Sequence, residues 1–144
     1  MSHKQPLICL IGLVTGRNPF LYKLCSGIFH IHLNCSPILD FNDYGCFCGV
    51  GGSGNPVDEL DSCCQTHDLC YNAAKTHPEC TDITDHPYVA LYDFTCSGTS
   101  ITCSSTNNGC KMSVCNCDRE ASMCFAEAPY NEEYKNLDKD LYCK

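Results

Sequence analysis

The sequence has few basic residues and lacks any long apolar stretch. Nine Lys and Arg stand against 17 Asp and Glu, which gives a formal net charge of −8. Nucleic-acid binding relies on clustered Lys and Arg that neutralise phosphates, so this balance argues against it and against recruitment mainly by anionic membranes. The longest apolar run, residues 7–14, is well short of the ~20 residues of a membrane span. We therefore expect no nucleic-acid partner and no membrane-spanning helix.

The cysteine spacing that is typical of zinc sites is also missing. Such sites pair Cys-x₂₋₄-Cys with a second such pair or with a His pair, and here no two cysteines stand three positions apart. Yet 16 of the 144 residues are cysteine, a share typical of a disulfide scaffold in an oxidising compartment. The length fits one domain. We expect a disulfide-rich, secreted, extracellular protein.

The first 36 residues differ from the remainder. Residues 1–45 contain only three cysteines, whereas residues 46–143 contain thirteen. The apolar run after Lys4 resembles the apolar part of a secretion signal, although its basic region is thin and no clear cleavage site follows. An irregular N-terminus is the alternative. We accordingly divide the chain into an atypical segment, 1–36, which is signal-like or aberrant, and a domain, 37–144.

Local patterns predict helices, a loop and a hairpin. Residues 44–54 hold five glycines in eleven positions and predict a loop. Asn55 as a cap and Pro56 as the first residue predict a helix to about Lys75. A second helix is predicted over 111 to about 125, and residues 89–96 and 100–103 predict a short hairpin. The tail from residue 129 is expected to be irregular.

Two pairs of cysteines indicate how the helices pack. Cys63 and Cys70 on the first helix, and Cys117 and Cys124 on the second, are each seven residues apart and so lie on one stripe of their helix. Bridges 63–124 with 70–117 make the helices antiparallel, and the reverse pairing makes them parallel. The intervening hairpin favours the antiparallel arrangement, but sequence alone leaves both open. The expected fold is mainly α, with two long antiparallel helices, a cation-binding loop and a small β-hairpin.

Three polar residues on these helices predict chemistry. If Cys70 and Cys117 are bridged, His67 and Asp118 face each other, and a carboxylate on one imidazole nitrogen leaves the other free to take a proton from water. Asp68 points elsewhere and, with carbonyl oxygens of the glycine-rich loop, offers the hard ligands that Ca²⁺ prefers. Each of these residues by itself could simply be packed in the core or exposed to solvent. The prediction of a site therefore depends on the spacing of all three.

Two long signatures around these residues resemble secreted phospholipase A2. They are Tyr44-Gly-Cys-Phe-Cys-Gly-Val-Gly-Gly-Ser-Gly, followed by Asp61-Ser-Cys-Cys-Gln-Thr-His-Asp-Leu-Cys-Tyr, and Cys115-Asn-Cys-Asp-Arg-Glu-Ala. The resemblance runs from about Pro37 to Cys143, some three quarters of the chain, and is greatest to the pancreatic, group I type. It marks residues 37–144 as a phospholipase A2 domain.

The resemblance implies a role for each matching residue. His67 would be the base that activates water, Asp118 would orient it, and Tyr71 and Tyr92 would support Asp118. Ca²⁺ would be held by Asp68 and by the carbonyls of Phe47, Gly49 and Gly51, and the Gly49 amide would help hold the oxyanion. The family usually has Tyr in place of Phe47, but the ligand is the backbone. The implied disulfides are Cys46–Cys143, Cys48–Cys64, Cys63–Cys124, Cys70–Cys117, Cys80–Cys110 and Cys103–Cys115.

The N-terminus departs from the group I pattern. Members of that group begin with an amphipathic helix, which is not found here, and with a cysteine that bridges to the position of Cys96. The place of that cysteine falls at His30, and Cys35 is the nearest substitute.

The resemblance leads to two functional hypotheses. The first is a secreted, Ca²⁺-dependent enzyme that hydrolyses the sn-2 ester of glycerophospholipids to a fatty acid and a lysophospholipid. It would be a monomer acting peripherally on phospholipid aggregates or membrane surfaces, with a cell-surface receptor as a further partner. The alternative is a catalytically impaired receptor-binding or lipid-binding protein on the same scaffold, because the usual first helix is missing.

Overall fold

The computed structural model describes residues 43–49, 51–81, 86–87, 90–97 and 100–144, and these residues are mainly helical. Two long helices, α4 (Glu59–Ala74) and α5 (Gly109–Glu127), are accompanied by a small sheet of β1 (Phe94–Ser97) and β2 (Ser100–Cys103). A 3₁₀ turn, η2 (Glu132–Tyr134), and a short helix, α6 (Lys139–Tyr142), follow. The predicted fold class is confirmed. The atypical segment 1–36 lies outside the described residues, and so does the Cys35 end of the suggested bridge to Cys96.

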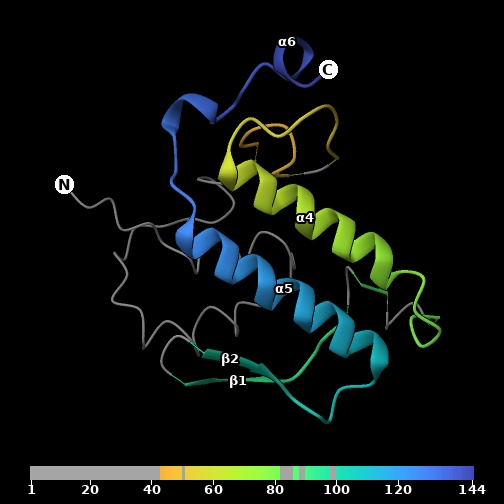
Figure 1. Cartoon of the computed structure of the whole chain (residues 1–144). Coiled ribbons are helices and arrows are strands. Elements are labelled where there is room, and N and C mark those ends of the chain that lie inside the picture. Colours follow the sequence, from red (N-terminus) through yellow and green to blue (C-terminus); the bar gives the residue numbers. More distant parts are fainter. Residues whose placement is uncertain (1–42, 50, 82–85, 88–89, 98–99) are drawn as a thin grey trace.

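Helices α4 and α5 run side by side in opposite directions (Figure 1). Disulfides Cys63–Cys124 and Cys70–Cys117 join them, with Cα–Cα distances of 5.8 and 5.7 Å. The antiparallel prediction is therefore confirmed. All six disulfides that the resemblance implied are present, the other four being Cys46–Cys143, Cys48–Cys64, Cys80–Cys110 and Cys103–Cys115.

The start of α4 differs from the prediction. The helix begins at Glu59 rather than Pro56, and its N-cap is Asp58, whose carboxylate accepts a hydrogen bond from the Asp61 amide (2.8 Å). The amide of Val57 donates instead to the Asp61 carboxylate (3.0 Å), which keeps this residue out of the helix. Acidic side chains that recruit backbone amides thus override the local Asn-Pro signal.

The hairpin is shorter than predicted at its first strand. Phe94 pairs with Cys103 and Ser97 with Ser100. Beyond Phe94 one backbone bond remains, from the Ser104 amide to the Asp93 carbonyl (2.9 Å). The strand ends there because the Asp93 amide donates to the side chain of Asn107 (2.8 Å), which also donates to the Asp93 carbonyl (2.7 Å). Helix α5 is slightly longer than predicted at both ends, and the tail, predicted to be irregular, contains η2 and α6.

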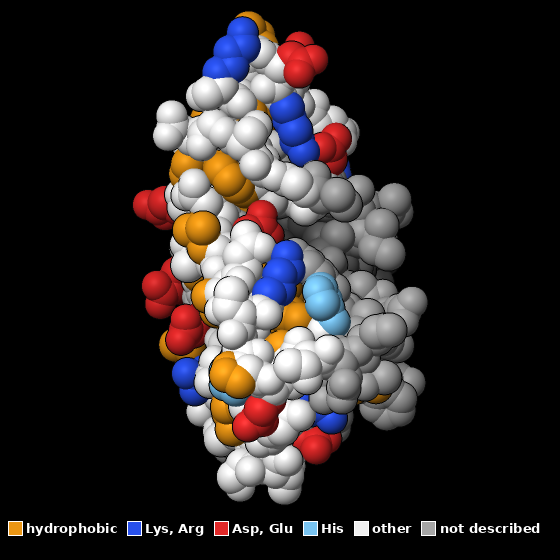
Figure 2. Space-filling model, turned by 90° about the vertical axis from the view of Figure 1, so that its right-hand side faces the viewer, with side chains coloured by type: hydrophobic (Ala, Val, Ile, Leu, Met, Phe, Trp, Pro, Cys, Tyr) orange, Lys and Arg blue, Asp and Glu red, His pale blue; other side chains and the backbone are white. Residues whose placement is uncertain are grey.

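Buried side chains form two clusters along the helix pair. One surrounds the loop that precedes α4 and includes Tyr44, Leu60 and Phe125, whereas the other includes Tyr71 and Val114. On the face shown in Figure 2, the described charged side chains of both signs are interspersed, with hydrophobic side chains between them. None of the helices in the described ranges is long and apolar enough to cross a membrane.

Candidate active site

The site lies where α4 and α5 are fastened together. His67 on α4 and Asp118 on α5 contact each other through Nε2 and Oδ1 at 2.8 Å. His67 lies one turn before Cys70, and Asp118 is next to Cys117, so the disulfide between these cysteines fixes the spacing of the two helices at the site. Both side chains are buried, with exposed fractions of 5 % and 4 %. The structure thus brings together the two residues that the sequence placed on facing stripes.

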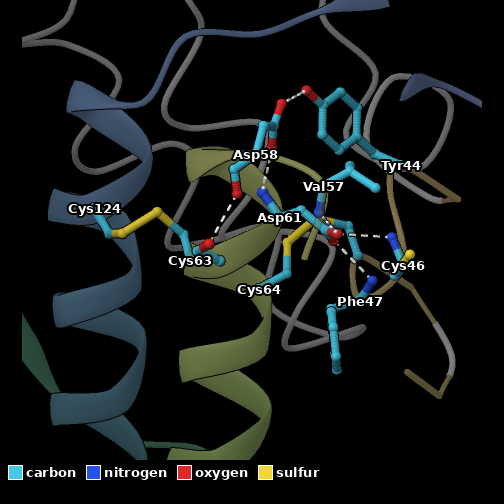
Figure 3. The surroundings of a disulfide bond; sticks show 11 residues. Tyr44, Cys46, Phe47, Val57, Asp58, Asp61, Cys63, Cys64 and Cys124 are labelled. Atoms are coloured by element: carbon cyan, nitrogen blue, oxygen red, sulfur yellow. Dashed lines mark hydrogen bonds between the residues drawn. A yellow bond between two sulfur atoms is a disulfide. The ribbon is translucent and has the colours of Figure 1, made fainter. Parts of the chain in front are cut away.

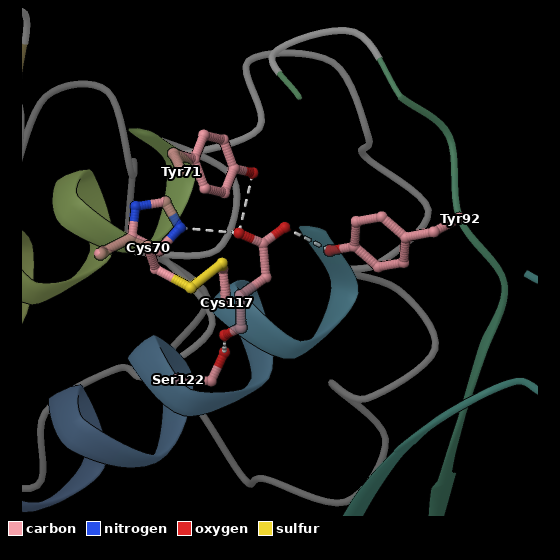
Figure 4. A network of polar contacts seen from close by, with 7 residues as sticks. Cys70, Tyr71, Tyr92, Cys117 and Ser122 are labelled. Carbon is pink, nitrogen blue, oxygen red and sulfur yellow. Dashed lines mark hydrogen bonds and ion pairs between the residues drawn. A yellow bond between two sulfur atoms is a disulfide. The ribbon is translucent and has the colours of Figure 1, made fainter. Parts of the chain in front are cut away.

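Two tyrosines complete the surroundings of the Asp118 carboxylate (Figure 4). The Tyr71 hydroxyl donates to Oδ1 at 2.9 Å, and the Tyr92 hydroxyl donates to Oδ2 at 2.5 Å. Burial, followed by the charge of Asp118, raises the pKa of Tyr92 far above its ordinary value, so this phenol remains a donor. Asp118 therefore accepts a tyrosine hydroxyl on each of its oxygens.

Sequence reasoning missed Ser122. Its buried hydroxyl donates to the backbone carbonyl of Asp118 at 2.6 Å and so fixes the turn of α5 from which the carboxylate projects. The position four residues after Asp118 was the available signal, because a helical Ser can bond the carbonyl one turn before it.

This arrangement determines which nitrogen of His67 is free. An ionised carboxylate only accepts hydrogen bonds, so Nε2 carries the ring proton that faces Asp118 and Nδ1 keeps its lone pair. Among the described residues no hydrogen bond involves Nδ1. The ring also packs on Tyr71, with centroids 4.3 Å apart. An imidazole oriented in this way can accept a proton from a water molecule.

The glycine-rich loop is attached to the same helix. The Cys48–Cys64 disulfide joins the loop to α4 at a Cα–Cα distance of 5.1 Å. Phe47 is buried, whereas Gly49 and Gly51 are exposed, and Gly51 has a φ of +73°, a conformation that side chains disfavour. Asp68 follows Cys64 by four residues, so both lie on the same face of α4. The loop and Asp68 therefore occupy one side of the helix.

The donors on this side suit a hard cation. In the ranges that the structure describes, no group of three or more His, Cys, Asp or Glu could hold a metal, so an ion here would need backbone oxygens besides Asp68. Asp68 is half-buried, and this burial raises the pKa of its carboxyl above the ordinary value. Carboxylate and carbonyl oxygens are the ligands that Ca²⁺ prefers, so the residues fit this ion.

Comparison with known proteins identifies the family. A family model described as phospholipase A2 matches residues 21–135. A phospholipase A2 of Ovis aries is 60% identical over 107 residues, which cover 74% of this chain and 86% of the relative. A phospholipase A2 of Oryctolagus cuniculus is 56% identical over 75% of this chain and 74% of the relative. An acidic phospholipase A2 of Bungarus fasciatus is 48% identical over 75% of this chain and 76% of the relative. The chain belongs to the phospholipase A2 family.

Proposed function

We propose that this protein is a Ca²⁺-dependent phospholipase A2 that hydrolyses the sn-2 ester of glycerophospholipids. The observation that carries the proposal is the His67–Asp118 contact of 2.8 Å, because it orients the imidazole and leaves its other nitrogen free. Six disulfides fit an oxidising compartment, so we propose that the enzyme is secreted. It would act as a monomer on the surface of phospholipid aggregates. The domain boundary at residues 36 and 37 remains a prediction.

In the proposed reaction His67 first accepts a proton and then donates the same proton. Nδ1 takes a proton from water as the water oxygen forms a bond to the ester carbonyl carbon. When the bond to the alkyl oxygen breaks, the same proton passes from Nδ1 to the departing lysophospholipid oxygen. The products are a fatty acid and a lysophospholipid. Asp118 stabilises the transient imidazolium at Nε2 and prevents the ring from turning.

Calcium would be held by the carboxylate of Asp68 and by the carbonyls of Phe47, Gly49 and Gly51. Bound there, it supplies positive charge that favours the negative charge developing on the ester oxygen. The Gly49 amide would donate a hydrogen bond to the same oxygen. The exposure of Gly49 supports this role, because a substrate must reach its backbone.

Fatty acid release from phosphatidylcholine micelles tests the proposal. We expect hydrolysis with calcium and its loss with a chelator. The variant His67→Gln should lower the rate by at least about 100-fold, because general bases typically contribute ~10²–10⁴-fold. Equal rates with calcium and with chelator, or no hydrolysis in either, would refute the proposed function. Binding to a cell-surface receptor that survives His67→Gln, with no wild-type hydrolysis, would instead support a catalytically impaired binding protein.

A further inference from the structure

Asp61 is a fully buried carboxylate that takes no part in the proposed reaction. Its relative exposure is 0 %. Oδ1 accepts a hydrogen bond from the Phe47 amide at 2.7 Å, and Oδ2 accepts from the amides of Cys46 and Val57 at 2.8 and 3.0 Å. Figure 3 shows these donors converging on the first turn of α4. One carboxylate therefore holds both the beginning and the end of the loop that spans residues 44–57.

The charge of Asp61 is balanced by backbone amides. In the part of the chain that the structure describes, no basic side chain forms an ion pair with it. A buried carboxylate needs such donors because burial otherwise disfavours its charged form. Gly45 is required for the close approach, since a Cβ there would collide with the Asp61 carboxyl group. The loop is thus built around this side chain.

The residues that Asp61 holds include a proposed calcium ligand. The amide of Phe47 donates to Asp61, and the carbonyl of the same residue is one of the proposed ligands. Two disulfides, Cys46–Cys143 and Cys48–Cys64, fasten the loop independently of Asp61. Loss of the carboxylate should therefore loosen the arrangement of the loop while its attachment to the fold persists.

We propose that Asp61 is a positioning residue for calcium: from the first turn of α4 it fixes the loop so that the carbonyl ligands are already in place when the ion binds. This inference rests on the proposed function, because it requires that the loop binds calcium. It assigns to the carboxylate a role in ion affinity that is separate from its contribution to folding.

The variant Asp61→Asn tests the inference. The amide keeps the size of the side chain but offers one oxygen, so either Phe47 or the pair of other amides must face an NH₂ group that cannot accept. We expect the dissociation constant for Ca²⁺, measured by isothermal titration calorimetry, to rise at least about tenfold, within the usual range of coupling between sites.

The matched control is Asp58→Asn. It removes the same charge from the same end of α4, and it weakens the helix cap and the hydrogen bond from the Tyr44 hydroxyl, but it leaves the three amide contacts of Asp61 intact. We expect it to lower the guanidinium midpoint while the calcium dissociation constant stays within twofold of wild type. A purely structural role of Asp61 predicts instead that the two variants behave alike. Wild-type affinity in Asp61→Asn would overturn the inference.

A measurement on the wild-type protein covers the case in which the variant fails to fold. Coupling is reciprocal, so if the Asp61 contacts favour calcium, then calcium must favour the Asp61 contacts. Saturating Ca²⁺ should slow hydrogen exchange of the Cys46, Phe47 and Val57 amides at least about tenfold. Unchanged exchange in a protein that binds calcium would refute the inference alone. A wild-type protein that binds no calcium would refute the proposed function as well.

Discussion

The two oxygens of Asp118 have unequal supplies of hydrogen bonds, and this predicts different effects of removing the two tyrosine hydroxyls. Oδ1 accepts from His67 and from Tyr71, whereas Oδ2 accepts, among the described residues, from Tyr92 alone. Tyr71→Phe therefore leaves Oδ1 with a strong partner. Tyr92→Phe leaves a carboxylate oxygen without a donor in a site where Asp118 is 4 % exposed.

The expected magnitudes follow from this difference. A hydrogen bond to a charged group typically contributes about 1.5–3 kcal/mol, and leaving a buried charged acceptor unsatisfied lies at the upper end. We expect Tyr92→Phe to lower the free energy of unfolding by about 2–3 kcal/mol and Tyr71→Phe by about 1 kcal/mol. The rings, and with them the packing against His67 and Phe94, persist in both variants.

Both losses of unfolding free energy can be measured by guanidinium unfolding, with circular dichroism as the signal. The measurement is made at neutral pH without calcium and with the disulfides intact. The exposed Tyr142 provides the control, because Tyr142→Phe removes the hydroxyl of a residue that is 57 % exposed and should change stability by less than about 0.5 kcal/mol. The slope of the transition should be the same in all variants. If Tyr71→Phe costs as much as Tyr92→Phe or more, the asymmetric account of Asp118 is wrong.

Two further predictions concern alkaline pH and the disulfides. Tyr92 has a pKa raised above its ordinary 10.0, so the stability it contributes is complete below pH 10 and is lost as the pH rises. Between pH 9 and 11 the unfolding free energy of wild type should fall more steeply than that of Tyr92→Phe, and parallel curves would contradict this. Replacing Cys48 and Cys64 by Ala should cost about 3 kcal/mol and weaken calcium binding, whereas replacing Cys80 and Cys110 should cost a similar amount without changing calcium affinity. Calorimetric titration with calcium measures the affinity of both double variants. Equal losses of affinity would contradict the proposal that the loop binds calcium.

The cysteines explain why so much of the helical frame could be predicted from sequence. Pairs seven residues apart on two helices restrict the packing to two arrangements, and the hairpin between them favours the one observed. His67 and Asp118 are close in sequence to bridged cysteines, so their contact follows from the same constraint. Covalent links at helical spacing thus carry tertiary information that hydrophobic periodicity alone does not.

The role of Asp61 could not be obtained from local patterns, and the start of α4 required a local pattern other than the Asn-Pro pair. The Asn55-Pro56 pair is a reasonable helix start by itself, but the contacts that decide the boundary are those of Asp58 and Asp61 with backbone amides three and four positions away. The contacts between Asp61 and the loop join residues 14 and 15 positions apart. A better signal was present: Asp58 and Asp61 occupy the N-cap and the third helical position, where a capping box places its two polar side chains. Asp61 can accept hydrogen bonds from the loop amides only because the folded chain brings the loop back to the helix. Local sequence does not specify that path.

Asp61 and Asp118 show how donor type decides what a buried carboxylate does. Each is almost fully buried and accepts three hydrogen bonds, yet the donors of Asp61 are backbone amides and those of Asp118 are side chains. Backbone amides do not titrate, so the hydrogen bonds of Asp61 do not depend on the protonation state of His67. The donors of Asp118 include an imidazole, so the carboxylate stabilises that ring more strongly once the ring has taken a second proton and become positively charged. The first acid is therefore suited to hold a loop still, and the second to respond to a proton that moves.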